Sequence, residues 1–189
     1  GTDPKRGSAT TVIPTVLIPV RFVFADGTVF DPSTDLVNGQ TPIQGIMNSP
    51  LFQNYEFTPG GVNVGNTQYG DAFQRANFWS SVSTRSPNYH VLLSQPTVMP
   101  VWTVNVPADK GSSYFDPYSG ITIPLVDNTL YYEQMYAALQ NVSPRSLPIV
   151  VSGVVWPDNG TPGTVNGYGN HGAVRTGRNV QTSINTTYG

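Results

Sequence analysis

Residues 63–79, NVGNTQYGDAFQRANFW, contain the pattern on which the interpretation of this chain depends. Asn66 or Thr67 can cap a helix, and apolar side chains then recur every three or four positions, the spacing of one helical face. These residues are Tyr69, Ala72, Phe73, Ala76 and then Trp79 or Ser80. The pattern predicts a helix whose aromatic face packs against the core.

The polar residues of this stretch fall mostly on the opposite face. Asp71 and Arg75 stand four apart, in the order that favours a surface ion pair worth a few tenths of a kcal/mol. The alternative is that Asp71 to Arg75 form the working face of an active site. We interpret them as the solvated side of a scaffold helix, the usual role of such a face.

Strand patterns lie on both sides of this helix. Residues 10–24, TTVIPTVLIPVRFVF, are apolar and β-branched but contain Pro14 and Pro19. Because proline cannot donate to a sheet ladder, they predict an edge strand or two short strands. Asp26-Gly27 predicts a hairpin turn. Residues 88–107 predict one bent strand or two, and residues 146–156 predict a buried strand.

Two further helices complete the predicted fold. Thr41 and Pro42 start one of them, and Asp127 or Asn128 caps the clearer one, which ends before Pro144. The clearer helix has a mostly apolar stripe of Leu130, Tyr131, Gln134, Met135, Ala138 and Leu139. Together the elements predict an α+β fold, with mixed sheet packed against two to three α-helices. We expect a flexible arm over residues 1–9, a single domain over 10–156, and a long irregular Gly/Asn/Thr-rich tail over 157–189 with at most one edge strand.

Composition excludes several classes of protein. Only 11% of the 189 residues are charged, the net charge is −2, and no basic patch occurs, which argues against nucleic acid as a partner. The absence of Cys excludes disulfides and thiol catalysis. No apolar run is long enough to span a bilayer. A polar, Lys-poor chain that starts at Gly1 is typical of a secreted bacterial protein after removal of its signal peptide.

Catalytic motifs are sparse. The chain has two histidines and contains no HExxH run, no GxSxG elbow and no phosphate-binding Gly-Lys-Ser/Thr loop. A pair of carboxylates for glycoside hydrolysis stays open, because their separation is spatial, but no pair stands out. We therefore predict no cofactor, no metal site and no catalysis by this chain alone.

Two kinds of residue are candidate ligand or modification sites. His171, flanked by glycines and close to Tyr168, is the candidate for ligand binding, with a loop histidine bonded to backbone as the alternative. His90 is interpreted as a packed or edge-strand residue. Three sequons begin at Asn141, Asn159 and Asn185 and are candidate glycosylation sites outside the cell.

Five stretches resemble, in this order, the N-terminal part of secreted, mostly uncharacterised bacterial proteins that look like zinc metallopeptidases. They are residues 13–33 (IPTVLIPVRFVFADGTVFDPS), 63–79, 88–98 (NYHVLLSQPTV), 147–156 (LPIVVSGVVW) and 167–174 (GYGNHGAV). The resemblance implies that His171 occupies the family's Tyr-His position. In that family a zincin-like His-Glu helix follows, and this chain reaches Gly189 without one, so the resemblance implies a scaffold without the zinc ligands.

Two functions follow as expectations. The first is a secreted, non-catalytic scaffold or interaction domain that binds a peptide or no ligand at all. The second is a structural subunit of an extracellular filament or surface assembly, which self-associates by strand addition through its terminal arms, residues 1–15 or 175–189. Low charge favours the second, because copies repel one another weakly.

Overall fold

The structure is a computed structural model that describes residues 9–118, 120–153, 156–158, 169–176 and 180–187. Its internal contacts divide the chain into two compact units. Unit 1 comprises Gly1–Thr15 and Gln44–Pro96, and unit 2 comprises Val16–Ile43 and Thr97–Gly189. The chain passes three times between the units, after Thr15, after Ile43 and after Pro96.

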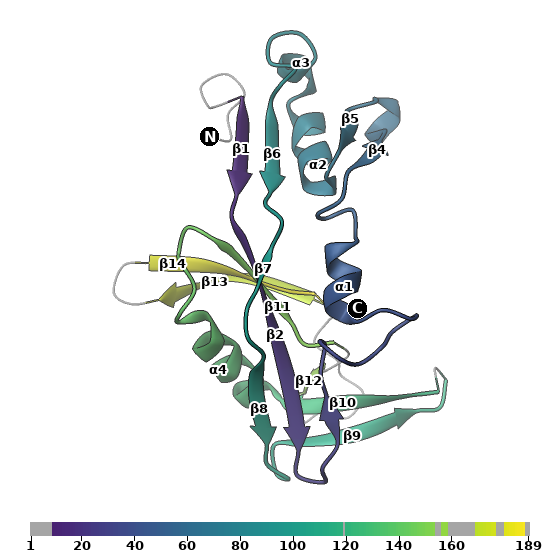
Figure 1. The fold of residues 1–189 in the computed structure, drawn as a ribbon, viewed down its shortest axis with the longest axis vertical. Helices are drawn as coiled ribbons and strands as arrows, with labels where there is room; N and C mark the ends of the chain where they lie inside the picture. Colours follow the sequence, from purple (N-terminus) through teal and green to yellow (C-terminus); the bar gives the residue numbers. More distant parts are fainter. Residues whose placement is uncertain (1–8, 119, 154–155, 159–168, 177–179, 188–189) are drawn as a thin grey trace. The chain divides into compact units, whose positions relative to one another are not determined.

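The main sheet belongs to unit 2 and is built around β2 (Thr15–Phe24), drawn in purple in Figure 1. β2 pairs in parallel with β7 and β8 and antiparallel with β3, and it also neighbours β11, which is followed by β14 and β13. The bounds are β3 Val29–Phe30, β7 Thr97–Val98, β8 Trp102–Val106, β11 Leu147–Val151, β13 Gly169–Thr176 and β14 Val180–Thr187. The predicted hairpin turn joins β2 to β3, with Gly27 at a φ of +87°.

The two prolines of the first strand region act differently from one another. Pro14 separates β1 from β2, as expected, but β2 is a central strand and not the predicted edge strand. Pro19 is tolerated there because it lies between the residues of β2 that pair with β7 and those that pair with β8. β7 pairs with Val16 and Leu17, and β8 pairs only from Val20 onward.

A second sheet of unit 2 has three strands in the order β12-β10-β9. β9 (Gly111–Asp116) and β10 (Ile121–Asp127) form an antiparallel hairpin, and β12 (Trp156–Asp158) pairs in parallel with β10. Gly111 is required by packing, because a Cβ there would overlap the Val106 side chain and lie 2.8 Å from the carbonyl oxygen of Leu125.

Helix α4 (Asn128–Leu139) packs on the core of unit 2. Its N-cap is Asp127, whose side chain accepts a hydrogen bond from the Leu130 amide, and Phe22 stacks on Tyr131 with ring centroids 6.0 Å apart. The predicted apolar stripe is confirmed by the buried helix residues Tyr131, Met135, Ala138 and Leu139. They join a cluster from β2, β8, β10 and β11.

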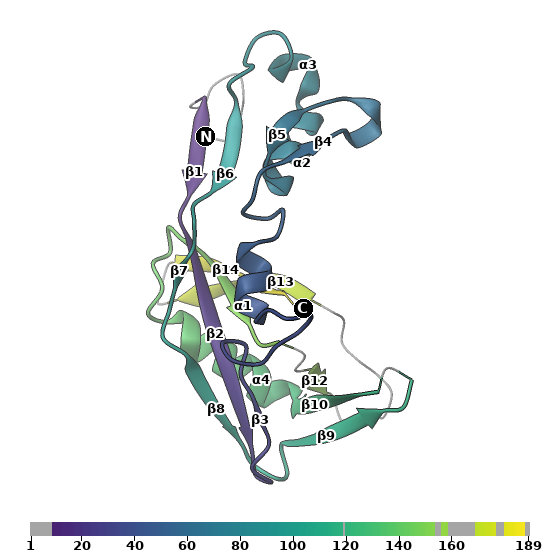
Figure 2. The ribbon, with the colours of Figure 1, turned by 45° about the vertical axis from the view of Figure 1, so that its right-hand side comes forward.

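Unit 1 contains two small sheets and a helical segment. β1 (Thr10–Ile13) pairs in parallel with β6 (His90–Leu93), and β4 (Tyr55–Phe57) pairs antiparallel with β5 (Gly65–Thr67). The helical segment consists of α2 (Tyr69–Asn77) and α3 (Trp79–Val82), and a short 3-10 helix, η1, covers Pro59–Gly61. Two-stranded sheets are marginal alone, so both depend on α2 beside them. Figures 1 and 2 show α2 next to β6, on the side away from β1.

The α+β class predicted from the sequence is confirmed, with four α-helices among the described residues, the remaining one being α1 (Pro42–Met47). The C-terminal segment contains more strand than expected. Where the sequence suggested irregular structure with one edge strand, the described parts form β12, β13 and β14. β14 lies between β13 and β11, since its Thr, Ser and Val residues suit a paired strand.

Candidate functional site

Helix α2 is oriented with its polar side inward. Gln68, Asp71 and Arg75, which we call the polar stripe, are 7%, 0% and 8% exposed. Tyr69 and Phe73, predicted to face the core, are 58% and 62% exposed. The predicted orientation of this helix is therefore wrong, and the reason lies in what the polar stripe binds.

The Asp71 carboxylate accepts three hydrogen bonds. Oδ2 accepts from Thr67 Oγ1 at 2.6 Å and lies 2.8 Å from His90 Nδ1, while Oδ1 accepts from the Val91 amide at 2.6 Å. In place of the expected surface ion pair with Arg75, Asp71 pairs with a histidine 19 positions later in the chain. A buried carboxylate is tolerated only with such partners.

Gln68 binds the same strand, β6, two residues further along. Its Oε1 accepts from the Leu93 amide at 2.7 Å, and its Nε2 donates back to the Leu93 carbonyl at 3.0 Å. A second donation reaches the Phe52 carbonyl at 3.2 Å. The two bonds to Leu93 reproduce the paired bonds that a neighbouring strand would make.

The polar stripe thus completes one edge of β6. The amides of His90 and Ser94 donate to the carbonyls of Ala9 and Ile13, on the β1 side. The amides between them, Val91 and Leu93, point the other way and end on Asp71 and Gln68. The helix therefore replaces a third strand with side chains, and this fixes its rotation.

Arg75 continues the same role at the end of the helix. Its Nε donates to the Val64 carbonyl at 2.9 Å, and its Nη1 donates to the carbonyls of Pro87 and Tyr89 at 3.0 and 2.6 Å. The guanidinium ties the helix to the segments that precede β5 and β6. Only the planar fork of an arginine offers several donors at fixed angles for such a task.

The Asp71–His90 pair has the geometry of a catalytic dyad, but no third member is seen among the described residues. A triad places a hydroxyl at the outer nitrogen of the imidazole. The hydroxyl of this cluster, Thr67 Oγ1, donates instead to Asp71 and is buried. His90 has 31% of its side chain exposed. The arrangement can hold β6 in place, and its polar groups are committed to that task.

Outside the polar stripe, unit 1 presents an aromatic surface, which we define as Tyr55, Phe57, Tyr69 and Phe73. Tyr69 and Phe73 stand one turn apart on α2, and Tyr55 and Phe57 share one face of β4. The rings of Phe57 and Tyr69 meet edge to face, with centroids 5.8 Å apart. Tyr55, Tyr69 and Phe73 are exposed, and Phe57 is half-buried. Exposed aromatic side chains that gather on one surface are typical of binding surfaces.

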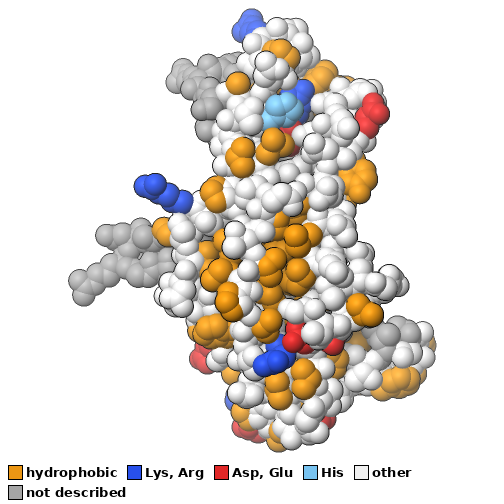
Figure 3. All heavy atoms as spheres, viewed as in Figure 1, with side chains coloured by type: hydrophobic (Ala, Val, Ile, Leu, Met, Phe, Trp, Pro, Cys, Tyr) orange, Lys and Arg blue, Asp and Glu red, His pale blue; other side chains and the backbone are white. Residues whose placement is uncertain are grey.

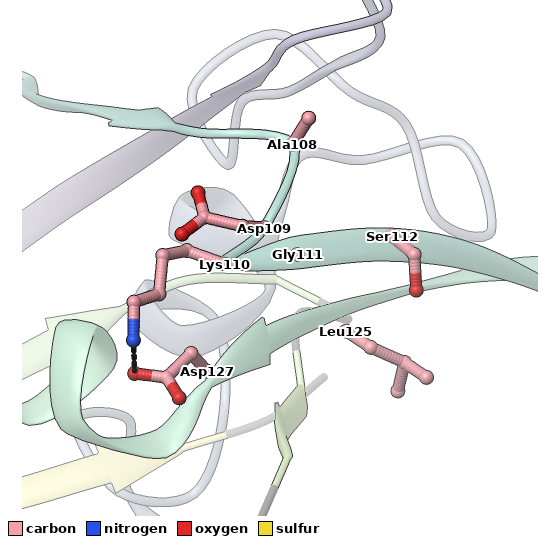
Figure 4. A pocket seen from close by; sticks show the side chains of 7 residues that line it. All are labelled: Ala108, Asp109, Lys110, Gly111, Ser112, Leu125 and Asp127. Carbon is pink, nitrogen blue, oxygen red and sulfur yellow. Dashed lines mark ion pairs between the residues drawn. The ribbon is translucent and has the colours of Figure 1, made fainter. Parts of the chain in front are cut away.

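A shallow cavity of about 230 Å³ lies in unit 2 at the start of α4 (Figure 4). Its lining residues are Ala108, Asp109, Lys110, Gly111, Ser112, Leu125 and Asp127. Lys110 Nζ lies 3.5 Å from Asp127 Oδ1. The hydrogen bond from the Leu130 amide, with help from Lys110, holds the pKa of Asp127 below its ordinary value. Two charged groups of this cavity, Lys110 and Asp127, therefore serve the helix cap.

The residues predicted as sites belong to other segments of the chain than the polar stripe. Tyr168 lies outside the described residues. His171 lies in β13, in register with Asn185 of β14, so both belong to paired strands and not to loops. Of the predicted glycosylation sites, Asn141 is exposed just after α4, and Asn159 lies outside the described residues.

Sequence reasoning missed the Asp71–His90 pair, although a signal existed. Gln68, Asp71 and Arg75 recur at helical spacing, as regularly as the aromatic residues do. Within the part of the chain that the structure describes, no group of three or more potential metal ligands occurs, and no helix has the length and apolar character needed to cross a bilayer. Comparisons with family models, curated proteins and solved structures found no match to this chain.

Proposed function

We propose that the chain is a secreted, non-catalytic interaction domain whose unit 1 binds an apolar stretch of polypeptide on the aromatic surface. The observation that supports this most directly is the orientation of α2. Burying a large apolar side chain is worth roughly 1.5–3 kcal/mol. The helix forgoes this gain at Tyr69 and Phe73 because its polar stripe is bound to β6, and a binding partner can recover it.

The chemistry of the surface favours a polypeptide recognised by apolar contact. Both charged groups of α2 are buried, and Glu56 of the neighbouring strand accepts a hydrogen bond from Asn63. Charged side chains are also sparse on the face shown in Figure 3. Uncharged tyrosine and phenylalanine side chains are the usual anchors of protein recognition. The resemblance to peptidase-like proteins points to the same class of ligand.

Pairing of the terminal strands supports this proposal over a filament joined by terminal arms. Near the N-terminus β1 pairs with β6, and near the C-terminus β14 pairs with both β13 and β11 of the same chain. β14 has both edges occupied, whereas β1 and β13 each have one partner among the described strands. The terminal strands are thus already part of sheets within their own chain, and donating them to another copy would require these pairs to break.

Peptide selection tests the proposal. Short random peptides displayed on phage are selected on the immobilised chain, and the binding of the enriched peptides is measured by fluorescence anisotropy. We expect aromatic or aliphatic peptides to be enriched, and we expect Phe73→Ser and Tyr69→Ser each to weaken their binding at least tenfold, about 1.4 kcal/mol.

The matched control is Tyr136→Ser, which removes an exposed aromatic side chain from a helix of unit 2. Its binding should equal that of the unchanged chain. The proposal fails if no peptide is enriched, or if the enriched peptides bind all four proteins equally.

A further inference from the structure

The strand β9 offers an open edge that the proposed function does not use. It is the outer strand of the sheet β12-β10-β9 and, among the described strands, pairs with β10 alone (Figure 2). Tyr114 is 50% and Phe115 is 60% exposed. Because neighbouring side chains point to opposite faces, both faces of β9 meet solvent. An edge without an internal proline or lysine is a template for strand pairing.

The hydrogen-bond pattern shows which backbone groups of β9 point outward. The Asp127 amide donates to the Lys110 carbonyl at 2.8 Å, so the backbone of Lys110 faces β10. In an antiparallel pair this direction alternates along the strand. Ser112, Tyr114 and Asp116 therefore also face β10, and Gly111, Ser113 and Phe115 direct their N–H and C=O groups away from it.

We propose that two copies of the chain pair through β9, antiparallel, across a two-fold axis at Ser113. In this register Ser113 faces Ser113 of the second copy, and Gly111 faces its Phe115. All three outward residues then stand in hydrogen-bonded pairs of two bonds each, about six bonds across the interface. The result is a continuous sheet through both copies, closed by symmetry.

Charge complementarity selects the same register. It places Lys110 directly opposite Asp116 of the second copy, and it does so twice because of the two-fold axis. Lys110 already lies 3.5 Å from Asp127 on that face of the sheet, so the second carboxylate extends an existing ion pair (Figure 4). Shifting the strands by two residues places Lys110 opposite a tyrosine instead.

The apolar side chains fit the pairing as well. Phe115 of one copy faces Gly111 of the other, beside the side chains of Val106 and Phe24. A Cβ at Gly111 would point at Val106 and Phe24, so apolar groups line the face on which the ring arrives. A net charge of −2 opposes the approach of two copies only weakly.

Reversing the charge of Lys110 or of Asp116 tests both the identity of the partner, a second copy of the chain, and the register of the pairing. The unchanged chain should show a concentration-dependent dimer in sedimentation velocity. Lys110→Asp and Asp116→Lys should each weaken it at least tenfold, because each places like charges opposite one another. An equimolar mixture of the two variants should restore a dimer. A strictly monomeric chain, or a mixture no more dimeric than its components, overturns the proposal.

Two further variants keep the test independent of the charges. Ser113→Pro removes an N–H that points outward, so the monomer should fold normally, as circular dichroism would verify, and the dimer should be lost. Ser113→Ala, which retains the N–H, should keep the dimer. Retention of the dimer in Ser113→Pro overturns the role of this edge.

Cross-linking reads the register directly, because the chain has no cysteine of its own. Cα atoms in a hydrogen-bonded pair are about 5.5 Å apart, within disulfide range. Ser113→Cys should therefore oxidise to a covalent dimer much faster than Ser112→Cys, which stands opposite Tyr114. Equal rates at the two positions would contradict the register.

Discussion

Replacing Asp71 with alanine tests whether the polar stripe holds unit 1 together. The substitution removes the acceptor of the bonds from Thr67 Oγ1, His90 Nδ1 and the Val91 amide. His90 can turn to solvent at little cost. The Val91 amide and the Thr67 hydroxyl are left on the inner side of β6, and an unsatisfied buried donor costs roughly 1–3 kcal/mol.

The expected loss for Asp71→Ala is therefore about 2–4 kcal/mol, after allowing for the desolvation cost that the lost carboxylate no longer imposes. Asp71→Asn should lose less, because its amide oxygen can still accept from Val91. Asn77→Ala, at an exposed position of the same helix, should stay within about 0.5 kcal/mol.

Urea unfolding followed by Trp79 fluorescence measures these losses in unit 1, in a background where Trp102 and Trp156 are replaced with phenylalanine. Trp79 then reports on its own unit alone. Equal unfolding free energies for Asp71→Ala and Asn77→Ala would refute the reasoning, because an aspartate on a solvated face makes no buried hydrogen bonds whose loss would lower stability.

Three other substitutions extend the account. Arg75→Lys keeps the charge but loses the guanidinium fork that binds three carbonyls, so it should cost about 2–4 kcal/mol in urea unfolding. The control Arg85→Lys, at an exposed position, should cost under about 0.5 kcal/mol. Equal costs for the two variants would contradict the hydrogen bonds assigned to Arg75. Gly111→Ala should cost roughly 1–3 kcal/mol through overpacking and lower the melting temperature, and Gly70→Ala, where a Cβ meets open space, should not. The hydrogen bond from the amide three residues on lowers the pKa of Asp127 from 3.8, so its carboxylate contributes stability above that pH and loses it as the pH falls through the folded-state pKa. The stability difference between the chain and Asp127→Asn should therefore be constant near neutral pH and shrink below about pH 4 in thermal melts; a difference that persists in acid would contradict the cap.

The sequence was sufficient where one periodic pattern had a single interpretation. In α4 the only regular stripe is apolar, and Tyr131 and Met135 lie buried as predicted. β8 alternates in the same way, with Val104 and Val106 buried. In both elements burial of apolar area outweighs other terms, so the pattern determines the face.

In α2 the same reasoning failed because the helix has two regular stripes. Periodicity cannot say which stripe faces inward when a polar one can satisfy an open strand edge. That edge belongs to β6, and its residues Val91 and Leu93 lie about twenty positions further along the chain. The edge strand predicted from Pro19 was wrong for a related reason. Pro19 is tolerated in a central strand because the partner strand changes there, and local sequence does not reveal that change.

Amide hydrogen exchange along β6 tests the central claim most directly, because the claim is that side chains of α2 serve as a neighbouring strand. In the unchanged chain the amides of Val91 and Leu93 should be protected as well as that of His90, which pairs with β1. Gln68→Ala should accelerate exchange of the Leu93 amide, and Asp71→Ala exchange of the Val91 amide, each at least tenfold more than it accelerates exchange of the His90 amide. Fast exchange of Val91 and Leu93 in the unchanged chain, or equal acceleration of all three amides, would contradict it.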